Sequence, residues 1–230
     1  MTETPEEIFA EEHTKFCNVH KAEIECLKSQ IASLYKENIE EKVLNELEIY
    51  NQNIKRGLEY NLIISEIGWT QQKILTPKQL SILILFSYLS YTEGVFSEIV
   101  QSIAFLLIQR DHNIYNPRKM EFVTSYEQLD ELDLFVKLQF IEKHGFKFLC
   151  DSVDRKLRNA IAHLDVVVNE DGSILNTKTG EKIKDLWQKI VRLGSVSYIT
   201  ETALKESLLN HMVKQVSLLK KQHEELTRTS

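Results

Sequence analysis

Residues that break helices are rare along this chain. Only seven glycines and three prolines occur among its 230 residues. Both types are unfavourable inside helices, glycine through its conformational freedom and proline through its missing N–H group. Hydrophobic residues make up 43% of the sequence, which is enough to bury a substantial core. We therefore expect an all-α protein that forms one domain, alone or with an extension.

The cysteines and the amino-terminal segment indicate an intracellular protein. Cys17, Cys26 and Cys150 form neither a Cys-x-x-Cys pair nor a cluster with histidines at zinc-binding spacing. We therefore expect no disulfide framework and no metal site. The first residues, MTETPEEIFAEEH, are acidic and lack the basic and apolar regions of a signal peptide. This predicts a cytoplasmic protein.

The most apolar part of the chain covers residues 80–108. Glu93, Glu98 and Gln101 interrupt it before about 18 consecutive apolar residues accumulate. We therefore predict a buried helix and no membrane span. The formal net charge is −6, so binding of RNA or another polyanion would require a local basic patch.

Helical periodicity divides the chain into segments. Apolar spacing predicts helices over residues 5–36, 40–58, 80–109, 132–143, 146–164, 182–193 and 202–225. A β-rich run at 62–64 followed by Gly68 predicts a turn, and Thr76-Pro77-Lys78-Gln79 has the pattern of a helix start. We therefore expect an N-terminal helical extension over residues 1–75 and a helical domain over residues 76–230.

The helix predicted at 146–164 has one apolar stripe and is followed by a hairpin. The stripe follows the 3.6-residue period and consists of Phe146, Leu149, Cys150, Val153, Leu157, Ala160, Ile161 and Leu164. Beyond it, three valines at 166–168 and Ile174-Leu175 flank a Glu-Asp-Gly-Ser segment. This pattern predicts a small β-hairpin.

Residues 154–163, with the sequence DRKLRNAIAH, are the candidate functional segment. They place three cations, an amide and an imidazole at the end of one helix. At about 100° per residue, Arg155, Asn159 and His163 share a face, whereas Arg158 lies about 140° around the helix from His163. A long arginine can reach around, especially where the helix packs near its own copy and two Arg–His sets converge on one cleft. This geometry predicts a homodimer.

Such a cleft suits an RNA phosphodiester. Arg158 offers paired donors to phosphate oxygens, and His163 can pass a proton to or from the ribose 2′-hydroxyl or the leaving oxygen. The helix dipole favours the protonated imidazole at the C-terminal end of the helix. This chemistry requires no metal and no cofactor. The chain also lacks a glycine-rich phosphate loop and a Ser or Cys nucleophile motif.

The segment Arg158-Asn159-Ala160-Ile161-Ala162-His163 resembles the Arg, polar residue, spacer and His motif of HEPN-domain proteins. The resemblance covers residues 77–184, where the order of the long apolar helix, the next helix, the motif helix and the hairpin is compatible. It implies an antiparallel helical bundle and a dimeric, metal-independent endoribonuclease. By this resemblance Arg158 binds the phosphate, His163 acts as acid or base, and Asn159 orients the site.

The resemblance also implies biological partners. HEPN proteins often serve as toxins or phage-defence nucleases, which implies RNA as substrate and an antitoxin or sensor protein as partner. Members paired with a nucleotidyltransferase antitoxin carry a tyrosine two residues beyond the histidine, where this chain has Asp165, and this departure puts that pairing in doubt. Some members have lost activity, so the alternative is a non-catalytic HEPN-fold binding module, which the net charge slightly favours.

Each candidate residue also has a structural interpretation. Asp154 and Arg158 lie four residues apart and can form a surface salt bridge. His163 can satisfy carbonyl groups at the helix end. Glu93 lies within the most apolar helix, where an unpaired carboxylate is costly to bury, so we expect it to face Arg155 or Arg158. We take Asp154, Arg155 and Glu93 as supporting residues of the site.

Overall fold

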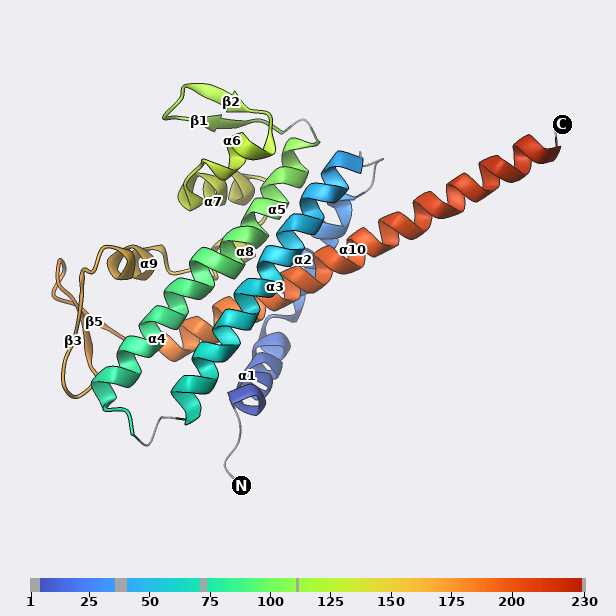
Figure 1. Cartoon of the computed structure of the whole chain (residues 1–230). Coiled ribbons are helices and arrows are strands. Elements are labelled where there is room, and N and C mark those ends of the chain that lie inside the picture. The colour runs from blue at the N-terminus through green and yellow to red at the C-terminus, as the bar shows by residue number, and fades with distance from the viewer. Residues whose placement is uncertain (1–4, 36–40, 71–73, 111, 229–230) are drawn as a thin grey trace.

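The computed structural model describes residues 5–35, 41–70, 74–110 and 112–228 (Figure 1). Its helices are α1 (Pro5–Val19), α2 (Lys21–Leu34), α3 (Glu41–Thr70), α4 (Pro77–Tyr91), the π-helical turn η1 (Thr92–Phe96), α5 (Ser97–Ile108), α6 (Tyr126–Asp130), α7 (Leu134–Lys143), α8 (Lys147–Cys150), α9 (Arg155–Ala162) and α10 (Leu186–Arg228). Antiparallel sheets are formed by β1 (Ile114–Asn116) with β2 (Glu121–Val123), and by β3 (Val166–Val168), β4 (Ile174–Asn176) and β5 (Lys182–Ile183). The structure is 73% helical, which confirms a mainly-α fold.

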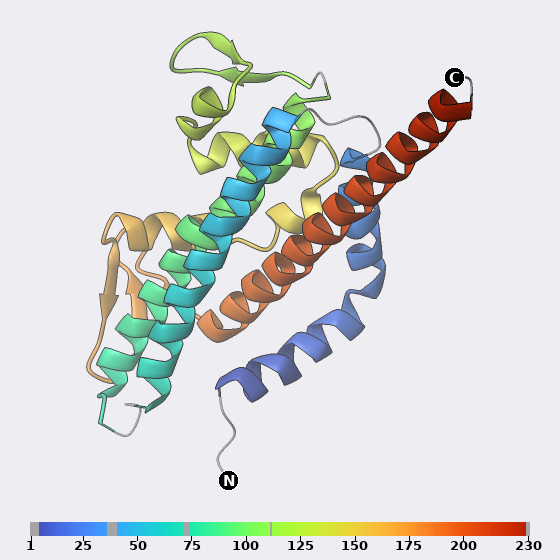
Figure 2. The same ribbon diagram turned by 45° about the vertical axis from the view of Figure 1, so that its right-hand side comes forward.

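Two long antiparallel helical rods form the centre of the bundle. α4, η1 and α5 continue one another as a single rod, and α3 runs alongside it (Figures 1 and 2). The rod begins with the predicted capping box, because the Thr76 side chain accepts from the Gln79 backbone while the Gln79 side chain accepts from the Thr76 N–H group. Residues 99–107 of α5 are all buried, as expected for the most apolar segment.

The central rod also has the length and hydropathy of a membrane-spanning helix. Among the described residues, Pro77–Ile108 is the one helical stretch that meets this criterion. The core helix of a soluble protein meets the same criterion. The cytoplasmic location therefore stays a prediction.

Helices on both sides of the predicted domain boundary share one hydrophobic core. α2 packs on α10, and α3 packs on α4, η1 and α5. Tyr50 and Ile54 of α3 are fully buried in the same cluster as Ile99 and Ile103 of α5. The boundary placed at residue 75 thus falls in the connection between two helices that pack against each other.

Two predicted interruptions of helices are wrong. α3 continues through the β-rich run at 62–64 to Thr70, and α10 runs unbroken from Leu186 to Arg228. The penalty for continuing these helices is small, because a β-branched residue costs a helix only about 0.5 kcal/mol. Within α10, Gly194 lies against the Phe9 ring of α1, and a Cβ there would come within 3.0 Å of that ring. The close approach of α1 therefore leaves little room for a Cβ at this position, which explains a glycine inside the helix.

Other boundaries also differ from the sequence pattern. The predicted helix at 146–164 is divided into α8 and α9. The predicted helix at 5–36 forms two helices that meet at His20 and end at Leu34, and its last residue lies outside the described residues. The apolar stripe is buried from Phe146 to Ile161, but Leu164 is 80% exposed. The hairpin of β3 and β4 is confirmed, and β5 extends it. The β1–β2 hairpin was not predicted, because strands of three residues are too short to show a clear alternation.

Gly57 allows α3 to approach η1 closely. A Cβ at this position would lie 2.9 Å from Cγ2 of Val95, whereas a Cβ at Gly94 would meet nothing within 4 Å. We expect Gly57→Ala to lower the free energy of unfolding by about 1–3 kcal/mol through overpacking. Gly94→Ala, the matched control, should leave it unchanged or raise it by up to about 1 kcal/mol. Urea denaturation followed by circular dichroism measures both, and equal effects would contradict this explanation.

Candidate functional site

Asp154 anchors the motif helix α9 to two other helices. Its Oδ1 accepts from the backbone N–H group of Leu157 at 3.0 Å and so caps α9. Its Oδ2 lies 2.6 Å from Nζ of Lys189 on α10. Its backbone N–H group donates to the hydroxyl of Tyr88 on α4 at 2.8 Å. The carboxylate thus pairs with Lys189, and the alternative salt bridge with Arg158 is wrong.

These contacts determine the charge of the Asp154 carboxyl group. Its partial burial alone would raise the pKa, but the hydrogen bonds from Lys189 and from the first turn of α9 outweigh burial and hold the pKa below its ordinary value. Asp154 is therefore a carboxylate throughout the neutral range. Asp154 therefore stabilises α9 both as its N-cap and through the ion pair with Lys189.

The C-terminal end of α9 is closed by a tight turn at Leu164. The backbone N–H of Leu164 donates to the carbonyl of Ile161 at 3.0 Å, and that of Asp165 donates to the carbonyl of Ala160 at 2.7 Å. This is a Schellman motif, which usually has glycine in the left-handed position. Here Leu164 adopts it with φ 56°. Because strand β3 follows at once, the turn fixes His163 between the helix and the sheet.

Arg158 is held where α9 faces the central rod. Its Nε donates to the Glu93 carboxylate, and its Nη1 donates to Oδ1 of Asn159 at 2.9 Å. The hydrogen bond with Glu93, partly offset by burial, raises the pKa of the guanidinium above its ordinary value. The side chain is 29% exposed, and its Nη2 group makes no hydrogen bond to any residue that the structure describes. That group is free to bind an anion.

Glu93, the expected partner, is presented by η1. This π-helical turn covers five residues in the middle of the rod, and such turns occur frequently at functional sites. The Glu93 side chain is 42% exposed, so water screens the ion pair, and its contribution to stability is at most about 1 kcal/mol. Its main effect is geometric, because it fixes the guanidinium of Arg158 through Nε.

Arg155 is bound by α7 rather than by the other motif residues. Its Nη2 lies 3.2 Å from Oε2 of Glu142, and its guanidinium carbon lies 5.2 Å from the centre of the Phe135 ring. The second contact is within the range of a cation–π interaction. Arg155 therefore fastens α9 to α7, and its guanidinium does not join Asn159 and His163.

His163 is the candidate residue that is left to solvent. It is the C-cap of α9 and its side chain is exposed. Its imidazole forms no hydrogen bond or ion pair with the residues of the described ranges. An exposed imidazole can bind a phosphate group and exchange protons with it.

Two positioning residues could not be found from the sequence. Tyr88 and Lys189 hold Asp154 but lie 66 and 35 residues away from it in the chain. Neither lies in a motif, and no local pattern connects them to Asp154. Only the packing of α4 and α10 around α9 brings them together.

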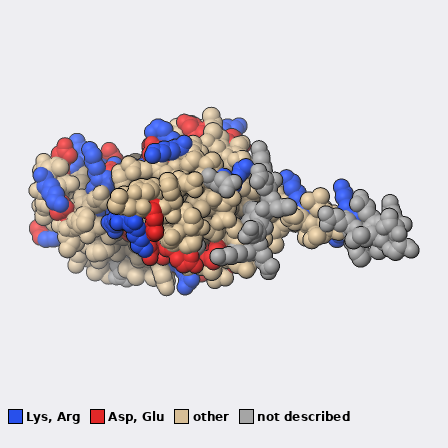
Figure 3. Space-filling view, turned by 90° about the horizontal axis from the view of Figure 1, so that it is seen from above, with Lys and Arg blue, Asp and Glu red and all other residues tan. Residues whose placement is uncertain are grey.

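The site is an open surface of the molecule. A hollow of about 370 Å³ lies between α4 and the sheet of β3–β5, and another of about 380 Å³ lies between α3 and α10; neither is lined by a motif residue. Basic and acidic side chains are interspersed on the face shown in Figure 3. Within the described part of the chain, no three His, Cys, Asp or Glu side chains gather as a metal site.

Comparison with protein-family models, with curated proteins and with solved structures finds no match to this chain. The resemblance to HEPN domains therefore depends on the motif and on the order of the elements.

The anchor at Asp154 predicts a pH dependence of stability. The pKa of Asp154 is lowered in the folded state. Its contribution to the free energy of unfolding is therefore fully present above the ordinary pKa and is lost as the pH falls through the lowered, folded-state pKa. Asp154→Asn keeps a capping side chain but loses the ion pair, so its unfolding free energy should fall less than that of the wild type between about pH 5 and about pH 3.

Asp154→Ala also loses the cap and should be less stable than Asp154→Asn by about 1 kcal/mol at pH 7. Urea denaturation over this pH range measures both differences. An unchanged pH profile in Asp154→Asn would contradict the role of the ion pair.

Proposed function

We propose that this chain is a metal-independent endoribonuclease of the HEPN type that acts as a homodimer. The observation that carries the proposal is the arrangement on α9, where Glu93 and Asn159 fix the guanidinium of Arg158 and His163 is open to solvent. A fixed arginine binds phosphate oxygens with little loss of side-chain freedom. RNA is the substrate class, because cleavage can use its own 2′-hydroxyl as nucleophile.

The proposed reaction transfers two protons. The ribose 2′-oxygen bonds to phosphorus while the bond from phosphorus to the 5′-oxygen breaks, leaving a 2′,3′-cyclic phosphate and a 5′-hydroxyl. One imidazole accepts the proton of the 2′-hydroxyl, and a protonated imidazole donates one to the 5′-oxygen. Arg158 stabilises the negative charge that develops on the phosphate oxygens.

The need for two proton-transfer groups supports a homodimer. Each chain supplies one motif histidine, His163, and its exposed position at the end of α9 allows a second copy to approach. A two-fold arrangement of two α9 helices brings one His163 to each side of the scissile phosphate. Each Arg158 then contacts the same phosphate from its own side.

Cleavage of a mixed RNA pool in EDTA tests the proposal. We expect the wild type to cut and to leave 2′,3′-cyclic phosphate ends. His163→Ala should lose about 100-fold or more in rate, because it removes a proton-transfer group. His112→Ala, a substitution outside the motif, should cut at the wild-type rate. Equal cleavage rates of the wild type and His163→Ala, or cleavage that requires a metal ion, would refute the proposed chemistry.

Glu93 should act through Arg158. Glu93→Gln keeps an acceptor for Nε and removes a negative charge near the bound phosphate, whereas Glu93→Ala removes both. We expect the Gln variant to keep cleavage within about threefold of the wild type and the Ala variant to lose about tenfold or more. Steady-state kinetics with an RNA oligonucleotide separates kcat from KM. An equal loss in both variants would contradict a role in orienting Arg158.

A second candidate function is a non-catalytic binding module of HEPN type. It is favoured by the pairing of the cations around α9, since Arg158 faces Glu93, Arg155 faces Glu142 and Lys189 faces Asp154. A net charge of −6 adds to this. Absence of cleavage together with retained RNA or protein binding would support this function.

A nuclease of this kind fits a toxin or phage-defence effector in the cytoplasm. Such an enzyme must be restrained, and an antitoxin or sensor protein is the partner that we propose. Asp165 stands where a tyrosine marks the members controlled by a nucleotidyltransferase. A protein that binds the exposed face of α9 and covers His163 would be an effective inhibitor.

A further inference from the structure

The C-terminal part of α10 leaves the body of the molecule as a single helix (Figures 1 and 2). His211 is the last residue of α10 that the structure shows as buried. The helix continues to Arg228, which is about 25 Å further at 1.5 Å per residue. We call residues 212–228 the arm. An isolated helix of this length is only marginally stable in water, so packing against another surface would stabilise it.

Apolar side chains follow one side of α10 from the edge of the body into the arm. Leu209, Met212, Val216 and Leu219 are between 50% and 62% exposed. They are separated by three, four and three residues, which is the spacing of the a and d positions of a two-stranded coiled coil. In the sequence, the next two positions of this repeat are His223 and Leu226. We call Leu209, Met212, Val216 and Leu219 the seam.

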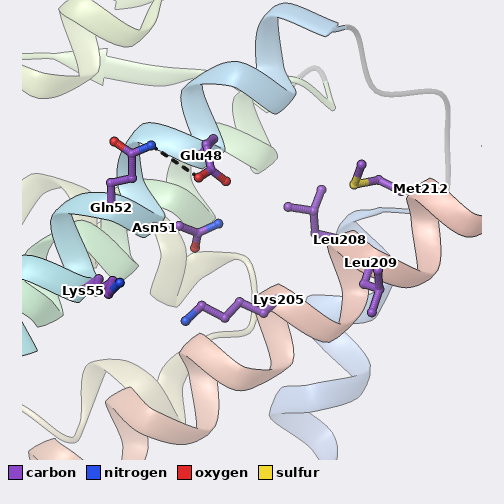
Figure 4. A pocket seen from close by; sticks show the side chains of 8 residues that line it. All are labelled: Glu48, Asn51, Gln52, Lys55, Lys205, Leu208, Leu209 and Met212. Carbon is purple, nitrogen blue, oxygen red and sulfur yellow. Dashed lines mark hydrogen bonds between the residues drawn. The ribbon is translucent and has the colours of Figure 1, made fainter.

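The seam begins in a groove on the body. The hollow of about 380 Å³ between α3 and α10 is lined on the α10 side by Lys205 and by the apolar Leu208, Leu209 and Met212. Figure 4 shows these apolar side chains on α10 across from polar side chains on α3. A helix that packs along the seam would therefore extend from the arm onto the edge of the bundle.

We propose that the seam pairs with the same seam of a second copy of this chain. A heptad stripe is complementary to a helix with the same repeat, and a second α10 supplies one through a two-fold contact. Val213, which flanks the seam, is also more than half exposed. Together, the four seam residues and Val213 of both copies expose about 1,000 Å² of side-chain surface that the contact could bury. This area is near the lower limit of a specific interface.

The charges on the arm predict how this pairing responds to salt. In the sequence of the arm, Lys214, Lys220, Lys221 and Arg228 outnumber Glu224 and Glu225, which gives a formal net charge of +2. Two arms side by side therefore repel each other, and salt screens this repulsion. Self-association should tighten as salt rises, whereas binding of the lysines to an anionic partner should weaken.

Pairing through the arm is independent of RNA cleavage. The arm points away from α9 in both ribbon views (Figures 1 and 2). The seam contact is thus separate from the contact that brings two His163 side chains together. A variant of the seam changes the size of the assembly without changing the residues of the site.

Sedimentation velocity of the full chain tests the proposal at protein concentrations up to about 100 µM. We expect the wild type to associate, and the double variant Val216→Gln with Leu219→Gln to have no more than about half its weight-average mass. Leu218→Gln is the matched control, because Leu218 is 51% exposed but lies off the seam. It should behave as the wild type, and circular dichroism should show that all variants remain helical.

Three results would overturn the proposal: equal masses of the wild type and the seam variant, a monomeric wild type, or association that weakens with salt. The last result would point to an anionic partner. Cleavage of RNA by the seam variant is measured in parallel. A lower weight-average mass of the seam variant with retained cleavage supports pairing through the seam. If neither the wild type nor any variant cleaves RNA but the mass changes as expected, only the nuclease proposal is rejected.

Discussion

The geometry of the candidate site depends on one junction, at Asp154. Its carboxylate caps α9 and pairs with Lys189, while its backbone N–H group binds Tyr88. One residue therefore joins the motif helix to the central rod and to α10. Because both the position and the rotation of α9 are fixed at its N-cap, the side chains further along it point in defined directions.

This rotation assigns different roles to two arginines that lie three residues apart. Arg155 reaches Glu142 and the Phe135 ring on α7, whereas Arg158 reaches Glu93 on the central rod. Each cation is thus balanced by a carboxylate of a neighbouring helix. In the proposed nuclease, a phosphate group would bind through the donors of Arg158 that remain unused and through His163. Specificity would then come from geometry more than from a strong positive field.

The two ends of the molecule offer different contacts. α9 presents an exposed histidine on the body of the bundle, and α10 extends away from it as an arm with an apolar seam. The two surfaces point in different directions.

The sequence alone determined the mainly-α class, the capping box at Thr76, the hairpin after the motif helix and the pairing of Glu93 with an arginine. These features depend on local signals: helix-breaker content, capping residues, turn residues and the cost of an unpaired carboxylate in an apolar helix. The division of residues 146–164 into α8 and α9 and the continuity of α3 and α10 were decided only by the tertiary structure.

The physical reason is that these features depend on groups far apart in the chain. Tyr88 and Lys189 fix the start of α9, and the close approach of α1 keeps Gly194 inside a continuous helix. Such contacts contribute more free energy than the local propensities that predicted a turn or a break. The sequence therefore proposed the residues of the candidate site, and only the packing of helices distant in sequence decided which of them face one another.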